Sequence, residues 1–223
     1  MEKIKIIFED ETLIVVEKPA GLTTTKERNN EGWTLEDELK KIKPNDLPRN
    51  GIVHRLDKGT SGLVLVAKNE GSWDNLRSQF KNRKITKKYI CLVSGDASIN
   101  GEVNMPIGRS KFGFGKFGIN LDGKEAWTIF KLIKKYKKEN KYFSLLEIDL
   151  KTGRTHQIRV HMNYLGWPLV GDKLYGGSVV DLNRPFLHAA YIQFTHPISN
   201  KTISFTSDLP NDLLNILNSY EEI

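Results

Sequence analysis

Short apolar segments rich in β-branched and aromatic side chains recur along this chain and indicate a fold built around a β-sheet. The first two, residues 3–8 and 13–17, are separated by an acidic turn and predict a hairpin. The segment 63–67 (Leu-Val-Leu-Val-Ala) is apolar throughout, as expected of a strand inside a core. Further strands are predicted over residues 89–93, 126–133 and 142–150.

Helix signals lie between and after these strands. Residues 34–37 resemble a capping box, and the helix that they open must end before Pro44. Ser72 is the expected N-cap of a second helix, in which apolar residues recur at helical spacing. Thr155 is the expected cap of a third helix that Gly166 ends, and residues 208–219 form a last one. The pattern predicts an α+β fold with a mixed, mostly antiparallel sheet flanked by helices and loops.

Size and charge restrict the domain organisation and the partner. A chain of 223 residues with 39% hydrophobic content can bury one sizeable core, so we expect a single domain over residues 1–223, in one lobe or two, with no appended domain. Lys and Arg number 34 against 27 Asp and Glu, which gives a net charge of +7. This excess favours a polyanionic partner, although an ordinary basic cytosolic protein has the same balance.

Several classes of protein are disfavoured by what the sequence lacks. Its single cysteine, Cys91, lies in an apolar alternation and is expected to be buried packing, so neither a disulfide framework nor a cysteine zinc site is predicted. His156 and His161 do not form a zinc site at their spacing without further ligands. No apolar run approaches the roughly 18 residues of a membrane-spanning helix, and residues 1–5 do not begin a signal peptide. We therefore expect a cytoplasmic protein.

The strongest candidate for a catalytic segment is residues 54–62 (His-Arg-Leu-Asp-Lys-Gly-Thr-Ser-Gly), directly before the apolar run 63–67. Such a turn can hold one carboxylate, that of Asp57, rigidly at the rim of a sheet. An Asp two residues before a glycine is also common as a turn or cap residue that binds backbone N–H groups. The neighbouring residues favour the reactive interpretation.

This segment resembles the signature of the RluA-type pseudouridine synthases, which isomerise uridine in folded RNA, and the resemblance extends over nearly the whole chain. The other matching motifs, in the family's order, are residues 6–10 with 13–21, 87–89 (Lys-Lys-Tyr), 123–126 (Gly-Lys-Glu-Ala), 152–161 (Thr-Gly-Arg-Thr-His-Gln-Ile-Arg-Val-His), 171–176 (Gly-Asp-Lys-Leu-Tyr-Gly) and 186–189 (Phe-Leu-His-Ala). The resemblance implies the pseudouridine synthase catalytic fold, with an active-site cleft across the sheet.

The resemblance also implies three catalytic residues and a reaction without cofactor or metal. Asp57 would start cleavage of the uridine glycosidic bond, as nucleophile or as base on the ribose, before the uracil rotates and rejoins through C5. Arg159 would keep Asp57 ionised and oriented; the alternative is a structural ion pair of Arg159 with another acid such as Glu147. Tyr89 would stack on the uracil and serve in the late proton removal from C5.

Further residues are expected to bind the RNA. Arg55 is the candidate to fill the space of the everted base, since a uridine must leave its stack to react. Phosphate contacts are expected from four cations, with a purely solvated role as the alternative for each: Lys18, Lys88, Lys124 and Arg154. The remaining candidates lie in the matching motifs: His54, Thr60, His156 and Leu187. Leu187 is equally well explained as a strand core residue.

Two departures from the family pattern are modest, with Gly59 where an acid is common and Trp167 where histidine is expected. Because the motifs begin at residue 6, no small N-terminal RNA-binding domain of the S4 type is expected, and recognition falls to the catalytic domain. That favours a compact target, a transfer-RNA stem-loop or a ribosomal RNA hairpin. No obligate protein partner is implied, and a monomer is expected.

The sequence supports three other interpretations less well. Residues 113–118 are formally Gly-x-Gly-x-x-Gly, but a strand and helix do not flank them as in a dinucleotide site, so we expect a mobile loop that reaches over RNA or is simply solvated. A non-catalytic RNA-binding protein or chaperone would not need Asp57, Tyr89 and Arg159 together. A hydrolase acting on a glycosidic bond normally pairs two carboxylates, and only Asp172 leaves that possibility open.

Overall fold

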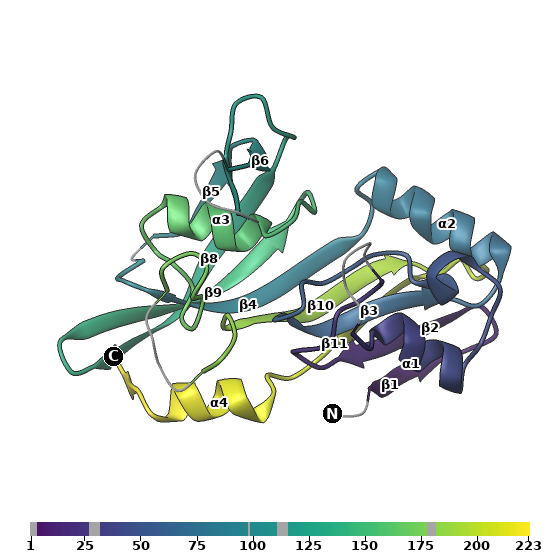
Figure 1. Ribbon diagram of the computed structural model, residues 1–223, viewed down its shortest axis with the longest axis horizontal. Coiled ribbons are helices and arrows are strands. Elements are labelled where there is room, and N and C mark those ends of the chain that lie inside the picture. The colour runs from purple at the N-terminus through teal and green to yellow at the C-terminus, as the bar shows by residue number, and fades with distance from the viewer. Residues whose placement is uncertain (1–3, 27–31, 98, 111–115, 178–181) are drawn as a thin grey trace. The chain divides into compact units, whose positions relative to one another are not determined.

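The computed structural model describes the chain except for residues 1–3, 27–31, 98, 111–115 and 178–181 (Figure 1). The chain divides into two compact units, of which the first is Met1–Thr86 with Ala189–Ser207 and the second is Lys87–His188 with Asp208–Ile223. The described elements confirm the α+β class, since four α-helices accompany a mixed, mostly antiparallel sheet. The single catalytic domain over residues 1–223 and the cleft across its sheet stay predictions.

The first unit is built on four neighbouring strands in the order β1, β2, β3, β10, with β11 paired to β10. Their bounds are Lys5–Glu9 for β1, Leu13–Lys18 for β2, Ser61–Ala67 for β3, Leu187–Thr195 for β10 and Thr202–Thr206 for β11. The predicted hairpin of β1 and β2 is confirmed. Its turn is closed by the Asp10 carboxylate, which accepts from the backbone N–H groups of Thr12 and Leu13.

Both faces of the central strands in this unit are buried. Leu13 and Val15 lie on one face with Leu76 of α2 (Glu70–Lys81), while Ile14 and Val16 on the other face are equally inaccessible. The capping box predicted at Thr34 is confirmed at the start of α1 (Leu35–Ile42). The N-cap predicted at Ser72 is wrong, because the helix begins three residues earlier and the Asn69 side chain accepts from the Ser72 N–H.

The second unit contains a second set of paired strands in the order β4, β9, β8, β12, with β5 also paired to β8. The bounds are Thr86–Ser94 for β4, Gly101–Asn104 for β5, Trp127–Lys138 for β8, Lys141–Leu150 for β9 and Glu221–Glu222 for β12. The strands predicted over 89–93, 126–133 and 142–150 are thus confirmed as β4, β8 and β9. The Cys91 side chain is buried on β4 as predicted, and burial raises the pKa of its thiol.

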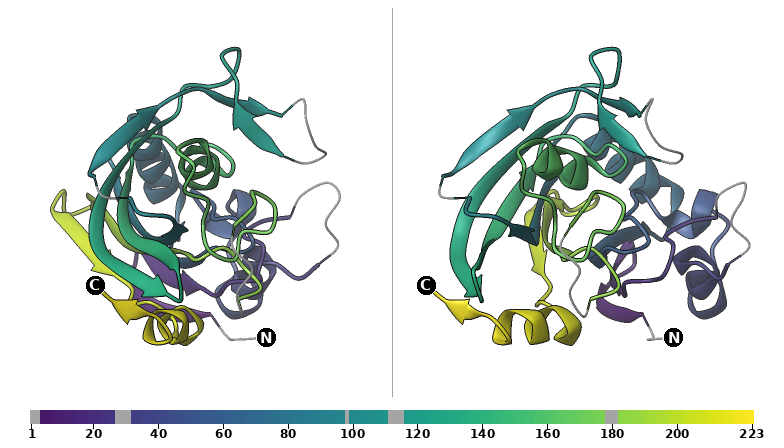
Figure 2. Two further views of the ribbon diagram at one scale, coloured as in Figure 1. Left: turned by 90° about the vertical axis from the view of Figure 1, so that its left-hand side faces the viewer. Right: turned by 60° about the vertical axis from the view of Figure 1, so that its left-hand side comes forward.

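Two helices cover opposite faces of these strands. Helix α4 (Asn211–Asn218) packs against Leu92, Phe143 and Leu145. Helix α3 (Gln157–Tyr164) is bonded through Gln157 and His161 to the Thr128 side chain on the other face. Figure 2 shows β8 and β9 curving around α3. The α3 face of the sheet is therefore the inner, concave one.

Two other predictions need correction. Residues 117 and 118 of the loop expected over 113–118 belong to the short strand β7 (Phe117–Ile119), which pairs with β6 (Ile107–Arg109), whereas residues 113–115 of that loop lie outside the described part of the chain. The last helix begins at Asn211 rather than near residue 208, because Pro210 has extended backbone angles and acts as the cap position. In the described ranges, no helix has the length and apolar character needed to cross a membrane.

Candidate active site

Asp57 lies in a turn of the first unit that is fastened through the backbone. The N–H of Thr60 donates to the Asp57 carbonyl at 3.0 Å, and the N–H of Gly21 donates to the Lys58 carbonyl at 2.7 Å. The Thr24 hydroxyl accepts from the Leu56 N–H and donates to the Leu56 carbonyl, at 3.1 and 2.7 Å. These bonds fix the main chain on both sides of Asp57 without using its carboxylate.

The turn is also anchored to β3. His54 Nε2 accepts from the backbone N–H of Leu65 at 2.9 Å, which requires that nitrogen to be unprotonated, and its ring lies 4.7 Å from that of Phe80. Gly62 has a φ of 118°, and a Cβ there would lie 2.3 Å from the Ala189 carbonyl oxygen. His54 thus holds the turn, and its predicted contact with RNA stays a prediction beside this structural role.

The candidate RNA contacts of the first unit differ in exposure. Arg55 is exposed, as a side chain that enters RNA must be, whereas Thr60 is buried. Lys18 is fully buried, and its ammonium donates to the carbonyls of Pro19 and Leu22 at 2.9 and 2.7 Å. The predicted phosphate contact of Lys18 is therefore wrong, because the charge is used inside the protein to hold the Lys-Pro-Ala-Gly turn.

In the second unit, Arg159 forms a buried, bidentate ion pair with Asp172. The Arg159 Nε and Nη2 atoms donate to the two Asp172 carboxylate oxygens at 2.6 and 2.8 Å. The two side chains are 10% and 1% exposed. Asp172 also accepts from the N–H groups of Leu174 and Tyr175, so the acid is fixed by its own turn. Such a pair orients a guanidinium as a point charge could not.

Tyr175 covers this guanidinium and links it to neighbouring elements. The Arg159 carbon Cζ lies 4.9 Å from the centre of the Tyr175 ring. The Tyr175 hydroxyl accepts from the backbone N–H of Phe117 in β7 at 3.0 Å and lies 3.0 Å from His156 Nδ1. His156 has a φ of 56°, a left-handed conformation that is uncommon outside glycine. It occupies the N-cap position of α3, so the cap predicted at Thr155 is wrong.

The partner observed for Arg159 is an acid that the sequence did not single out for it. Glu147, the alternative considered, instead accepts from the Lys88 ammonium at 2.9 Å. Lys88 was expected to contact phosphate, and this half-exposed pair gives it a local partner as well. The pairing of Arg159 with Asp57 stays a prediction, since the two residues belong to different units.

Tyr89 lies on the same face of its sheet as α3. Tyr89 is paired with Ile148 of β9, which in turn is paired with Phe130 of β8. Phe130 is two residues from Thr128 and so shares its face, and α3 is hydrogen-bonded to Thr128 on that face. Lys87 shares this face by alternation along β4. Burial lowers the pKa of Lys87 to about 8, against the opposing effect of the Asp149 charge. The second unit thus gathers a tyrosine, a lysine and an oriented arginine on its concave face.

The other candidate RNA contacts of this unit have varied surroundings. Lys124 is exposed, while Arg154 Nε donates to the Glu125 carbonyl at 2.8 Å. Leu187 is buried at the start of β10, which agrees with its description as a strand core residue. No group of three or more His, Cys, Asp or Glu side chains suited to a metal ion occurs among the residues that the structure describes.

Sequence reasoning missed the roles of Asp172, Tyr175 and Lys87. Asp172 and Tyr175 stood in a matching motif, Gly-Asp-Lys-Leu-Tyr-Gly, but nothing in their spacing assigns them to Arg159. For Lys87 a signal was available, because residues two apart on a strand share a face and Tyr89 was already a candidate.

Comparison with known proteins identifies the family. The model of the RNA pseudouridylate synthase family matches residues 12–164. The chain therefore belongs to the RNA pseudouridine synthases and is an RNA uridine isomerase.

Individual relatives agree with this assignment. An uncharacterized RNA pseudouridine synthase of Bacillus subtilis, YlyB, is 38% identical over 96% of this chain and 72% of its own length. The ribosomal large subunit pseudouridine synthase D of Zymomonas mobilis is 39% identical over 94% of this chain and 70% of its own length. The solved structure of human RNA pseudouridylate synthase domain containing 1 has a TM-score of 0.80 and 25% identity, with 99% of this chain and 89% of that one covered.

Proposed function

We propose that this enzyme isomerises uridine in the RNA of the large ribosomal subunit, with Asp57, Tyr89 and Arg159 as its catalytic residues. The observation that supports ribosomal RNA as the target is the similarity over nearly the whole chain to enzymes named for that substrate, with 39% identity to the one from Zymomonas mobilis. The fixed turn around Asp57 and the oriented guanidinium of Arg159 support the catalytic assignment, because both are arrangements that hold reactive groups still.

In the proposed reaction, the bond between C1′ of the ribose and N1 of uracil breaks and a bond between C1′ and C5 forms. Asp57 acts on the ribose carbon as nucleophile or on the ribose as base. The detached uracil rotates and C5 bonds to C1′, while any bond between Asp57 and C1′ breaks. The C5 proton then leaves and N1 takes up a proton. Tyr89 stacks on the uracil and assists that proton transfer. No atom is gained or lost overall, so the proposed chemistry needs no cofactor.

Tritium release tests the proposal directly, because re-attachment of the base through C5 displaces the C5 hydrogen of uridine and the assay contains no other reactant that modifies C5. Unmodified transcripts of large-subunit ribosomal RNA and of transfer RNAs, labelled at uridine C5, are incubated separately with the enzyme. We expect release from the ribosomal RNA. Release from transfer RNA alone would contradict the proposed target, and RNA binding without release from either pool would contradict the proposed function.

Arg55 is proposed to occupy the position of the everted base. Eversion from a stack costs a few kcal/mol, so Arg55→Ala should slow turnover of a folded RNA at least tenfold while an RNA with the target uridine already unstacked reacts at the wild-type rate. Initial rates on the two RNAs give the comparison. Lys58→Ala is the matched control, since Lys58 is an exposed cation in the same turn. An equal effect of Arg55→Ala on both RNAs would show a simple phosphate contact instead.

Family membership supports RNA as the partner. We further propose that the enzyme works as a monomer, without an obligate protein partner, in the cytoplasm where ribosomal RNA is found. Sedimentation equilibrium of the purified protein, alone and with RNA, would reveal a dimer if this part of the proposal is wrong.

A further inference from the structure

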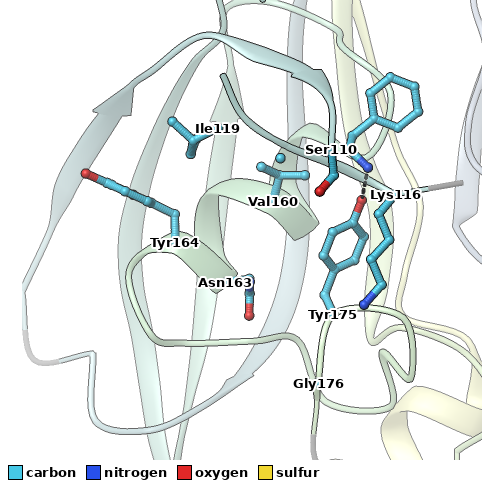
Figure 3. Close-up of a pocket in the computed structure, with 10 residues that line it drawn as sticks. Ser110, Lys116, Ile119, Val160, Asn163, Tyr164, Tyr175 and Gly176 are labelled. Atoms are coloured by element: carbon cyan, nitrogen blue, oxygen red, sulfur yellow. Dashed lines mark hydrogen bonds between the residues drawn. The ribbon is translucent and has the colours of Figure 1, made fainter. Parts of the chain in front are cut away.

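A hollow of about 470 Å³ lies on the second unit, next to the Arg159 cluster, with which it shares Phe117 and Tyr175 (Figure 3). Its walls come from β7, from the last turns of α3 and from the turn after Asp172. The side chains that matter to its chemistry are Lys116, Ile119, Val160, Asn163, Tyr164 and Tyr175. A volume of this size suits a single small group rather than a length of polymer.

The lining fits a ligand that combines a flat ring with negative charge. In Figure 3, Lys116 and Tyr175 stand on one side of the hollow and Tyr164 on the other, with Asn163 between them. Tyr164 is 54% exposed, so its ring is available for stacking, and Asn163 is exposed as well. None of the described residues that line the hollow is acidic. An aromatic face, an amide and a cation without opposing carboxylates are the groups that bind a base and its phosphate.

The position of the hollow relative to Arg159 restricts what this ligand can be. Tyr175 lines the hollow, and the same ring lies against the Arg159 guanidinium at 4.9 Å. Its hydroxyl is held by the Phe117 N–H, so the wall that separates the two is fixed. A group in the hollow is therefore about one side chain away from the arginine proposed to act on the target uridine.

The geometry points to this hollow as the binding site for a nucleotide that flanks the target uridine in the substrate RNA. The inference rests on the proposed function for the identity of the RNA. The flanking base stacks on Tyr164 and meets the Asn163 amide, while its phosphate meets Lys116. Binding there fixes the register of the strand and so selects which uridine reaches the catalytic residues.

The test compares Tyr164→Ala with Tyr142→Ala. Tyr142 is a matched control, because it is 49% exposed on β9 of the same unit and does not line the hollow. On a transcript of large-subunit ribosomal RNA, Tyr164→Ala should raise KM about tenfold, in the range of a lost base-stacking contact, and lower kcat far less. Tyr142→Ala should change neither. Equal effects of the two substitutions on KM would overturn the inference.

Ultraviolet cross-linking to the same transcript locates the nucleotide and does not require turnover. Mass spectrometry should find a nucleotide attached to the peptide that contains Tyr164, and the RNA position should lie within a few nucleotides of the isomerised uridine. No cross-link to this peptide, or one far from that uridine, would overturn the inference. Tritium release without the cross-link leaves the proposed function intact and overturns only the inference about the hollow. The cross-link without any tritium release supports RNA binding in the hollow but contradicts the proposed function.

Discussion

Replacing Asp57 with asparagine is expected to abolish tritium release while leaving the protein folded and able to bind RNA. Asparagine has nearly the same shape but can neither attack the ribose nor accept a proton from it. Loss of a group that acts directly on the reacting atoms lowers turnover by roughly a thousandfold or more. The hydrogen bonds described for this turn use main-chain atoms of Asp57 and Lys58, which the substitution retains.

Asp74→Asn is the matched control for this prediction. Asp74 is an exposed carboxylate on α2 in the same unit, so its replacement removes one negative charge without touching the turn. Turnover is measured by tritium release under single-turnover conditions, and RNA affinity by filter binding. Near-normal release by Asp57→Asn would remove Asp57 from the catalytic role and would favour another acid, while loss of RNA binding would indicate that the turn had collapsed.

The parts of the fold that sequence patterns predicted are those determined by local rules. The hairpin of β1 and β2 follows from alternating segments joined by an acidic turn, and the capping box at Thr34 needs only residues three apart. Where two capping residues compete, the local rule is ambiguous. Asn69 and Ser72 both suit a helix start, and the observed helix uses the earlier one.

The parts that could not be predicted depend on contacts between distant segments. His156 takes a left-handed backbone conformation, which the local sequence Thr-His does not predict. In the folded chain, this conformation occurs together with contacts of the His156 ring with Tyr175 and Phe117. From the sequence, Lys18 is expected to be a surface cation beside a turn, but in the folded chain its side chain is buried and its ammonium donates to backbone carbonyls. The same is true of the candidate site. The resemblance of the motif predicted Arg159 as a site residue, but only the folded turn at residues 171–176 shows that Asp172 orients its guanidinium.

That pairing leads to the second large effect, which is expected at Asp172. Asp172→Asn keeps a similar shape but removes the carboxylate that forms the buried, bidentate ion pair with the Arg159 guanidinium. Removing one member of a buried ion pair costs about 3–5 kcal/mol, because the remaining buried charge loses that partner. For a chain of this size, that loss lowers the midpoint of thermal unfolding by roughly 10 °C. Differential scanning calorimetry of the two proteins measures the shift.

The pair of Arg184 and Asp212 provides a control with almost the same geometry and a different environment. Arg184 Nε and Nη2 donate to the Asp212 carboxylate at 2.6 and 2.9 Å, but the Asp212 side chain is 48% exposed and that of Asp172 is 1% exposed. Arg184 is as buried as Arg159, at 9% against 10% exposed, but water reaches this pair through the exposed acid, so Asp212→Asn should cost less than Asp172→Asn and shift the midpoint by a smaller amount. Equal shifts for the two substitutions would show that burial does not set the strength of the Arg159 pair.

Turnover separates the role of Asp172 in orienting Arg159 from its role in stability. At a temperature where both variants are fully folded, Asp172→Asn should still lower kcat by tenfold or more, because an amide no longer holds the guanidinium through two charged hydrogen bonds. Asp212→Asn should keep the wild-type kcat at that temperature. If Asp172→Asn regains full turnover once it is cooled below its unfolding transition, the acid only stabilises the second unit, and the orientation of Arg159 must depend on contacts other than this ion pair.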